Sequence, residues 1–253
     1  MFLDVNGTRL HALAFGAGPR TLVAVGGWTG SWEVWEEPIA QLTAHNWRCI
    51  AYDHRGAGES PTDPADITVD AMVTDVVAVL DAFGVERCIL AGESQGGAIA
   101  QYAAARTPER FEGLVLSAPS PTGRNEGSTA DPCRTDYPAV VAGFVERCFP
   151  EAGSDHIKRW AKNILLRAEP EQAARIIEMW GDEAVTDVDA RELELPVLLL
   201  HGTADAIVPI ELTRTLVEIL PDAELVEFDG AGHVPTMTRP DEVVAAIRRR
   251  FGG

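Results

Sequence analysis

The feature that most constrains the fold of this chain is a regular alternation of short apolar runs with segments of helical periodicity. The apolar runs lie near residues 21–25, 47–53, 87–92, 113–118, 196–201 and 223–228. Such alternation indicates βαβ units, in which the strands of the sheet run parallel. Ahead of them, residues 2–15 form two alternating runs around Asn6-Gly7, a dipeptide that favours a tight hairpin turn. We therefore expect an α/β fold, with a mostly parallel, eight-stranded sheet and an antiparallel N-terminal hairpin.

One stretch of the chain, about residues 120–190, lacks strand signals altogether. Three amphipathic helical patterns replace them, at 138–149, 156–168 and 171–180. An insertion that follows the carboxyl end of a strand is well placed to cover the ligand crevice of such a sheet. We expect a single domain over residues 1–253 in which this insertion forms a helical lid. The alternative is a helical layer that makes no contact with substrate.

Composition argues against several classes of function. The 21 basic and 39 acidic residues give a net charge of −18, which repels nucleic acid and anionic lipid surfaces. No window approaches the roughly 18 consecutive apolar residues of a membrane span, and the N-terminus lacks the pattern of a signal peptide. The four cysteines show no spacing typical of a zinc site or a disulfide framework. We expect a cytoplasmic protein that acts on a small molecule, with its oligomeric state left open.

The segment Gly92-Glu-Ser-Gln-Gly96 fits the pattern G-x-S-x-G. It follows the apolar run 88–91 and precedes the helix-forming run 97–105, which is the context that this motif requires. A strained turn that exposes Ser94 Oγ brings the strand and helix backbones too close for a Cβ atom at either glycine. The motif therefore predicts Ser94 as a nucleophile.

A serine hydroxyl needs a base to take its proton, and histidine titrates in the suitable range. His233 lies in the loop Gly-Ala-Gly-His-Val-Pro after the expected strand 223–228, and catalytic side chains concentrate in such loops. The other five histidines are typical of exposed, capping or strand-end positions: His11, His45, His54, His156 and His201. His233 is the predicted base.

The base in turn needs a carboxylate to orient its ring. Asp205 directly follows the buried run 196–200 and precedes an expected helix. The chain order of serine, acid and histidine that accompanies this turn favours Asp205. Asp222 and Asp229 are the alternatives, but both flank the last expected strand and are typical of solvated turns.

Taken together, these motifs resemble those of the α/β-hydrolase superfamily, in its lidded, esterase-like and lactonase-like branch. Asp53-His-Arg-Gly-Ala-Gly-Glu-Ser60 matches a turn that is structural in that family, and His201-Gly-Thr-Ala-Asp-Ala-Ile-Val-Pro209 matches the segment that carries its acid. The resemblance covers essentially the whole chain. It implies that Ser94, Asp205 and His233 form a catalytic triad, without a metal or organic cofactor.

The family's oxyanion loop is usually His-Gly followed by a variable residue, and here it corresponds to residues 26–30, Gly-Gly-Trp-Thr-Gly. Gly26 stands in place of the histidine, which affects the rigidity of the loop more than its chemistry, because the donors are backbone N–H groups. The resemblance implies that these donors are the amides of Trp28 and Gln95, and that the Trp28 indole faces the pocket.

The resulting prediction is a serine hydrolase that cleaves a carboxylic ester or lactone of a moderately sized, largely apolar substrate through an acyl-enzyme. The expected pocket walls are Trp28, Val234, Phe144, Trp160 and Trp180. A serine nucleophile argues against the dehalogenase-like and epoxide-hydrolase-like relatives, in which an aspartate attacks. Three alternatives stay open: carbon–carbon bond hydrolysis of a dicarbonyl as in meta-cleavage hydrolases, perhydrolase or haloperoxidase-like activity, and a ligand receptor on the same fold.

Overall fold

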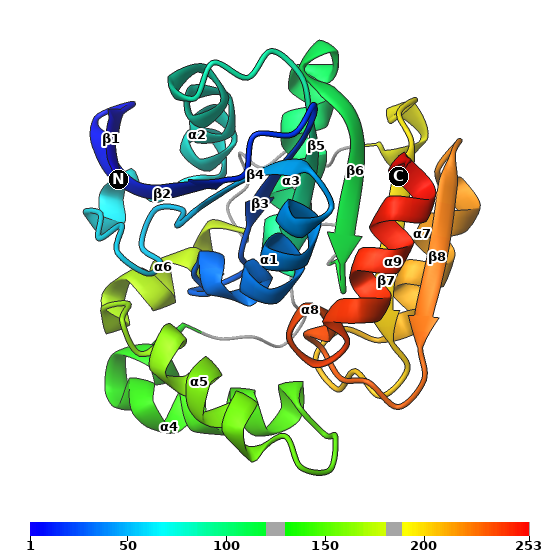
Figure 1. The fold of residues 1–253 in the computed structure, drawn as a ribbon. Coiled ribbons are helices and arrows are strands. Elements are labelled where there is room, and N and C mark those ends of the chain that lie inside the picture. Colours follow the sequence, from blue (N-terminus) through cyan, green and yellow to red (C-terminus); the bar gives the residue numbers. More distant parts are fainter. Residues whose placement is uncertain (120–129, 181–188, 253) are drawn as a thin grey trace.

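A single mixed β-sheet organises the computed structural model, which describes residues 1–119, 130–180 and 189–252 (Figure 1). Its strands are β1 (Phe2–Val5), β2 (Thr8–Phe15), β3 (Arg20–Val25), β4 (Trp47–Tyr52), β5 (Cys88–Glu93), β6 (Phe111–Ser117), β7 (Val197–Gly202) and β8 (Ala223–Phe228). Within the described residues they form one eight-stranded sheet in the order β1-β2-β4-β3-β5-β6-β7-β8. The pairs β1–β2 and β2–β4 are antiparallel and every other pair is parallel. The predicted fold class is confirmed.

Helices fill the intervals between the strands. The α-helices are α1 (Glu36–Ala44), α2 (Val69–Ala82), α3 (Gln95–Arg106), α4 (Asp131–Cys148), α5 (Asp155–Leu165), α6 (Pro170–Met179), α7 (Ile210–Ile219), α8 (Pro235–Thr238) and α9 (Pro240–Phe251). Short 3-10 turns are η1 (Trp32–Trp35), η2 (Pro64–Asp66), η3 (Pro108–Arg110) and η4 (Ala190–Glu192). Of the helices in the described ranges, none has the length and apolar character needed to cross a membrane.

The apolar runs become strands because the centre of the sheet is covered on both faces. Every residue of β5 and β7 is buried, so these strands carry no alternation of polar and apolar residues. Among the helices that surround the sheet, α1 packs against α9, and α2 packs against α3. A side chain on either face of a central strand therefore leaves water on folding, which makes these strands visible as continuous apolar runs.

Helices α4, α5 and α6 form a separate layer between β6 and β7 in the chain, here called the helical insertion. It lies beyond the carboxyl ends of the strands (Figure 1). Its first helix starts earlier than the predicted 138–149 and is kinked at Asp136, just before Pro138, whose ring cannot fit a regular helix interior. The outer parts of the predicted lid, residues 120–129 and 181–188, lie outside the described residues.

A buried ion pair joins the turn after β4 to α2 and to the first hairpin. Arg55 Nε lies 2.6 Å and Nη2 3.0 Å from the two carboxylate oxygens of Asp75, and Nη2 also donates to the carbonyl of Asn6 at 2.9 Å. Both charged side chains are buried. Such a pair adds little to the free energy of unfolding when compared with a well-packed apolar pair in its place. Removal of one partner, however, leaves an unpaired charge in the interior and is strongly destabilising.

Substitution of Asp75→Asn should therefore lower the free energy of unfolding by about 3 kcal/mol or more. The control is Asp81→Asn on the same helix, because Asp81 is 65% exposed and pairs with Arg110 at the surface at 2.8 Å. The loss in the free energy of unfolding for Asp81→Asn should stay within about 1 kcal/mol. Urea unfolding of the parent and both variants measures the difference, and equal losses in the two variants would contradict the buried pair's importance.

Candidate active site

The connection from β5 to α3 is a strained turn with Ser94 at its tip. Ser94 has φ +53° and ψ −118°, an unfavourable backbone conformation for a residue with a side chain. A Cβ atom on Gly92 would lie 2.2 Å from the Gly96 oxygen, and one on Gly96 would lie 2.5 Å from the Gly26 oxygen. The predicted steric reason for both glycines is confirmed. The turn can form only because no side chain occupies either position.

Ser94, His233 and Asp205 lie in one hydrogen-bonded chain. Ser94 Oγ is 3.0 Å from His233 Nε2, and His233 Nδ1 is 2.8 Å from Asp205 Oδ2. The other carboxylate oxygen of Asp205 accepts the backbone N–H groups of Ile207 and Val208 at 2.7 and 3.0 Å. An ionised carboxylate can only accept, so Nδ1 carries the proton and Nε2 of the neutral ring is free to accept from the serine. The structure brings the three predicted residues together in the orientation that proton transfer from Ser94 requires.

Asp205 and His233 each stabilise the charged form of the other. Burial disfavours the ionised form of Asp205, but the nearby His233 and hydrogen bonds from His201 and His233 outweigh it and hold the pKa of the carboxyl well below its usual range. Burial likewise opposes protonation of His233. The charge and hydrogen bond of Asp205, together with Glu93, outweigh that effect and raise the pKa of the imidazole above its ordinary value.

Glu93, the variable residue before Ser94, is part of the site although its motif assigns it no role. The side chain is only 5% exposed; Oε2 accepts the N–H of Gly27 at 3.2 Å, and Oε1 lies 3.6 Å from His233 Nε2. Oε1 has no hydrogen-bond partner among the described residues. Burial raises the pKa of this carboxyl to about 7, although His233 and the Gly27 amide act in the opposite direction. In the sequence, the sign that could have pointed to Glu93 is an acidic residue at the end of an otherwise apolar strand.

The loop after β3, residues 26–30, passes beside Ser94. A Cβ atom on Gly26 would lie 2.3 Å from the Gly30 oxygen, so the histidine that the family usually has here does not fit this loop conformation. Trp28 has φ +35°, and its indole Nε1 donates to the carbonyl of Ala173 in α6 at 3.1 Å. Gln95 follows Ser94 directly as the first residue of α3. The loop and the first turn of α3 therefore flank the serine hydroxyl.

The loop that carries His233 rests on the end of α4. The His233 N–H donates to the Cys148 carbonyl at 2.9 Å, and the Gly232 N–H donates to Glu151 Oε1 at 2.9 Å. The Phe144 ring meets the imidazole edge to face at a centroid distance of 6.3 Å. The helical insertion thus fixes the backbone and one face of the predicted base.

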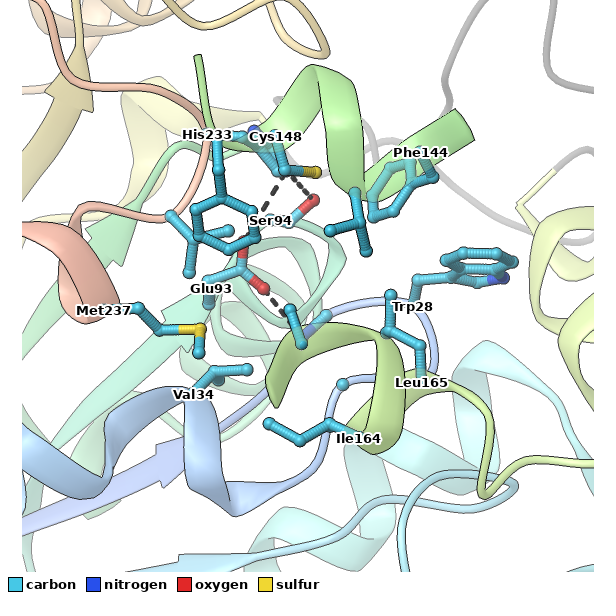
Figure 2. A pocket seen from close by; sticks show the side chains of 16 residues that line it. Trp28, Val34, Glu93, Ser94, Phe144, Cys148, Ile164, Leu165, His233 and Met237 are labelled. Atoms are coloured by element: carbon cyan, nitrogen blue, oxygen red, sulfur yellow. Dashed lines mark hydrogen bonds and ion pairs between the residues drawn. The ribbon is translucent and has the colours of Figure 1, made fainter. Parts of the chain in front are cut away.

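A narrow cavity of about 40 Å³ lies beside Ser94 and His233 (Figure 2). Its walls are mostly apolar and come from α4, α5, η1 and the loop and short helix after β8. Three of the predicted wall residues line it: Trp28, Phe144 and Val234. Among the described residues that line it, Glu93 is the one with a carboxyl group, and His233 carries the imidazole. No group of three or more potential metal-ligating side chains occurs within the described ranges.

The remaining two predicted wall residues do not line this cavity. Trp160, in α5, turns its indole Nε1 toward Glu33 at 3.5 Å. Trp180, at the end of α6, is buried with its ring 6.0 Å from that of Tyr102 in α3. Both side chains instead attach the helical insertion to the sheet domain. An apolar stripe shows that a helix face is buried, but it does not show what covers that face.

The known proteins that this chain resembles are hydrolases or share the alpha/beta hydrolase fold. A family model described as the alpha/beta hydrolase fold matches residues 20–189, and one described as TAP-like protein matches residues 175–251. The chain is 30% identical to the pimeloyl-[acyl-carrier protein] methyl ester esterase of Aeromonas salmonicida, over 94% of this chain and 97% of the relative. It is 29% identical to a putative carbamate hydrolase of Azorhizobium caulinodans, over 89% and 88%. The enol-lactonase structure from Burkholderia xenovorans LB400 has the same fold, with a TM-score of 0.90, 24% identity and 99% of both chains covered.

The geometry around Glu93 makes a prediction about His233. Substitution of Glu93→Gln should lower the pKa of the imidazole, because it removes a carboxylate charge 3.6 Å from Nε2 and keeps an acceptor for the Gly27 N–H. An NMR titration of the histidine ring signals measures the midpoint.

The matched control is Glu151→Gln, which also keeps its acceptor for a backbone amide next to His233 but does not face the ring. Its midpoint should equal that of the parent. An unchanged midpoint in Glu93→Gln would show that the carboxylate does not act on the imidazole.

Proposed function

The chain belongs to the α/β-hydrolase fold family, and we propose that it is a serine hydrolase that cleaves a carboxylic ester or lactone. The observation that carries this proposal is the hydrogen-bonded chain Ser94–His233–Asp205 at the wall of an apolar cavity. Relatives named as an esterase and as a putative carbamate hydrolase support a hydrolytic reaction.

In the proposed reaction, Ser94 Oγ attacks the substrate carbonyl carbon while its proton passes to His233 Nε2, 3.0 Å away. Asp205 holds Nδ1 and stabilises the imidazolium that results. When the tetrahedral intermediate collapses, the bond to the alcohol breaks and His233 returns its proton to the leaving oxygen. A water molecule then repeats these steps on the acyl-enzyme, which releases the acid and restores Ser94.

The negative oxygen of the tetrahedral intermediate needs preorganised donors. We assign this role to the backbone N–H groups of Trp28 and Gln95. Their segments flank Ser94, and Gln95 stands at the positive end of the α3 dipole. Neither donor depends on side-chain chemistry, so the absence of a histidine at Gly26 is compatible with the reaction. No metal or organic cofactor enters this scheme.

We further propose that the helical insertion acts as a lid and selects the acyl part of the substrate. Phe144 from α4 and Ile164 and Leu165 from α5 line the cavity beside Ser94. Neither arginine nor lysine occurs among the described residues that line the cavity, and the ionised form of Glu93 would repel an anionic group. These features favour an uncharged, largely apolar acyl chain or lactone.

The assignment of the nucleophile and base has a direct test. Ser94→Ala or His233→Ala alone should lower kcat by about 10³-fold or more, and the double variant should lose little further activity, because the two side chains act as a unit. Hydrolysis of p-nitrophenyl butyrate measures kcat and KM.

The control for this test is Ser117→Ala. Ser117 is a buried serine at the end of the neighbouring strand β6, and its hydroxyl has no hydrogen-bond partner in the part of the chain described. Its activity should match that of the parent. Near-native turnover by Ser94→Ala would exclude the proposed mechanism.

The substrate class predicts a dependence on acyl chain length. Each buried methylene contributes about 0.8 kcal/mol, so kcat/KM should rise roughly fourfold per CH₂ from acetate upward until the cavity is full. A dicarboxylic half-ester of matched length should be a poor substrate. A flat series, or a preference for the half-ester, would contradict an apolar acyl site.

Two adjacent leucines provide matched variants for this series. Leu165 lines the cavity and is 7% exposed, whereas Leu166 is 43% exposed and does not line it. Leu165→Ala should move the optimum toward longer chains, and Leu166→Ala should leave it in place.

A further inference from the structure

The backbone of Trp28 is held in a conformation that it would not adopt by itself. Its φ of +35° lies on the left-handed side, which a bulky residue keeps only when the surrounding structure fixes it. Trp28 also supplies one of the two oxyanion donors in the proposed function. The contacts that fix this residue therefore decide where that N–H group points.

Two hydrogen bonds to the helical insertion fix the loop at Trp28 and at the next residue. The Trp28 indole donates to the Ala173 carbonyl of α6 at 3.1 Å. Thr29 Oγ1 lies 3.0 Å from the hydroxyl of Tyr137 in α4, which donates its single proton to the Leu165 carbonyl of α5 at 2.6 Å. Since that proton is used, Thr29 must donate to Tyr137. The hydroxyl pair Thr29–Tyr137 thus links the loop to α4 and α5 in one directed chain.

This hydroxyl pair is shielded from water and lies against Trp28. Thr29 is fully buried, Tyr137 is 4% exposed, and the Tyr137 ring meets the Trp28 indole edge to face at 5.9 Å. A buried hydroxyl that loses its partner has no water to replace it. The pair is therefore made or broken together with the packing of the helical insertion against the loop.

We propose that Thr29 and Tyr137 are positioning residues that couple the placement of the helical insertion to the Trp28 amide. The inference rests on the proposed function, since it assumes that this amide stabilises the oxyanion. With the pair intact, the amide points at the intermediate. When the pair is broken, the residue relaxes from its left-handed conformation and the donor turns away. The covering helices then contribute to the rate of acyl transfer as well as to the choice of substrate.

The test removes the hydroxyl pair without changing the shape of either side chain. Tyr137→Phe and Thr29→Val should each lower kcat about tenfold and leave KM within about twofold, less than the full loss of an oxyanion donor. Both remove the Thr29–Tyr137 hydrogen bond, and Tyr137→Phe also removes the bond to the Leu165 carbonyl. The double variant should therefore lose no more activity than Tyr137→Phe alone. Thr29→Ser keeps the hydroxyl and should retain parent activity.

A second readout separates positioning from a merely structural role. A trifluoromethyl ketone analogue of the substrate adds to Ser94 and generates the oxyanion, whereas the corresponding unfluorinated ketone stays trigonal. Tyr137→Phe should weaken inhibition by the fluorinated ketone about tenfold, in parallel with kcat, and leave binding of the unfluorinated ketone unchanged. If both ketones weaken equally, or if Thr29→Ser loses as much activity as Thr29→Val, the positioning role is refuted.

The control for a lost tyrosine hydroxyl is Tyr52→Phe. Tyr52 is buried at the end of β4, and within the described residues its hydroxyl has no hydrogen-bond partner, so activity should not change. Full activity of Tyr137→Phe, with Ser94→Ala inactive, would overturn this inference and leave the proposed function intact. If the parent enzyme is instead insensitive to the fluorinated ketone and the Ser94→Ala variant remains active, the proposed function is overturned, and this inference with it.

Discussion

The close approach of two backbone segments, the turn after β5 and the loop after β3, is the constraint on which the rest of the site depends. A Cβ atom on Gly27 would lie 2.8 Å from Ser94 Cβ, and one on Gly96 would meet the carbonyl oxygens of Val25 and Gly26. Ser94 and Trp28 both keep positive φ angles there, each at a cost of about 1–3 kcal/mol. The buried parallel strands on either side supply the packing that holds both segments against this strain. A side chain at either glycine would separate the nucleophile from the segment that faces it.

Much of the fold and part of the site could be read from the sequence because their causes are local. Buried parallel strands appear as apolar runs, and the carboxyl ends of β5, β7 and β8 meet at one edge, which brings Ser94, Asp205 and His233 together. The contacts of Tyr137 and Trp160 join residues more than a hundred positions apart, and no spacing rule links them to Thr29 or Glu33. Their apolar periodicity predicts burial but leaves the partner undefined. The partners of these buried side chains could therefore be found only from the three-dimensional structure.

The helical insertion serves both sides of the site. On one side the Cys148 carbonyl holds the backbone of His233, and on the other Tyr137 holds Thr29 beside Trp28. The same helices, α4 and α5, supply apolar walls of the cavity. Residues that shape the substrate site and residues that set the geometry of the reacting groups thus lie on the same helices. A change that enlarges the cavity by shifting α4 as a whole would also move the support of the base, whereas truncation of a single wall side chain would not.

The order of strands in the sheet has a consequence for how the molecule acquires activity during folding. Ser94 and His233 are 139 residues apart in the chain, and the segments that carry them follow strands separated by β6 and β7 in the sheet. Of the pairings that join these strands, β6 with β7 has the longest range and pairs Leu114 with Val197. Pairings between residues so far apart in the chain close slowly, because the entropy of large loops is lost before the contacts form. The helices can form on much shorter timescales, from local interactions alone. During refolding we therefore expect helical content to be recovered before turnover, because turnover also requires β8, whose following loop carries His233, to be paired in the sheet.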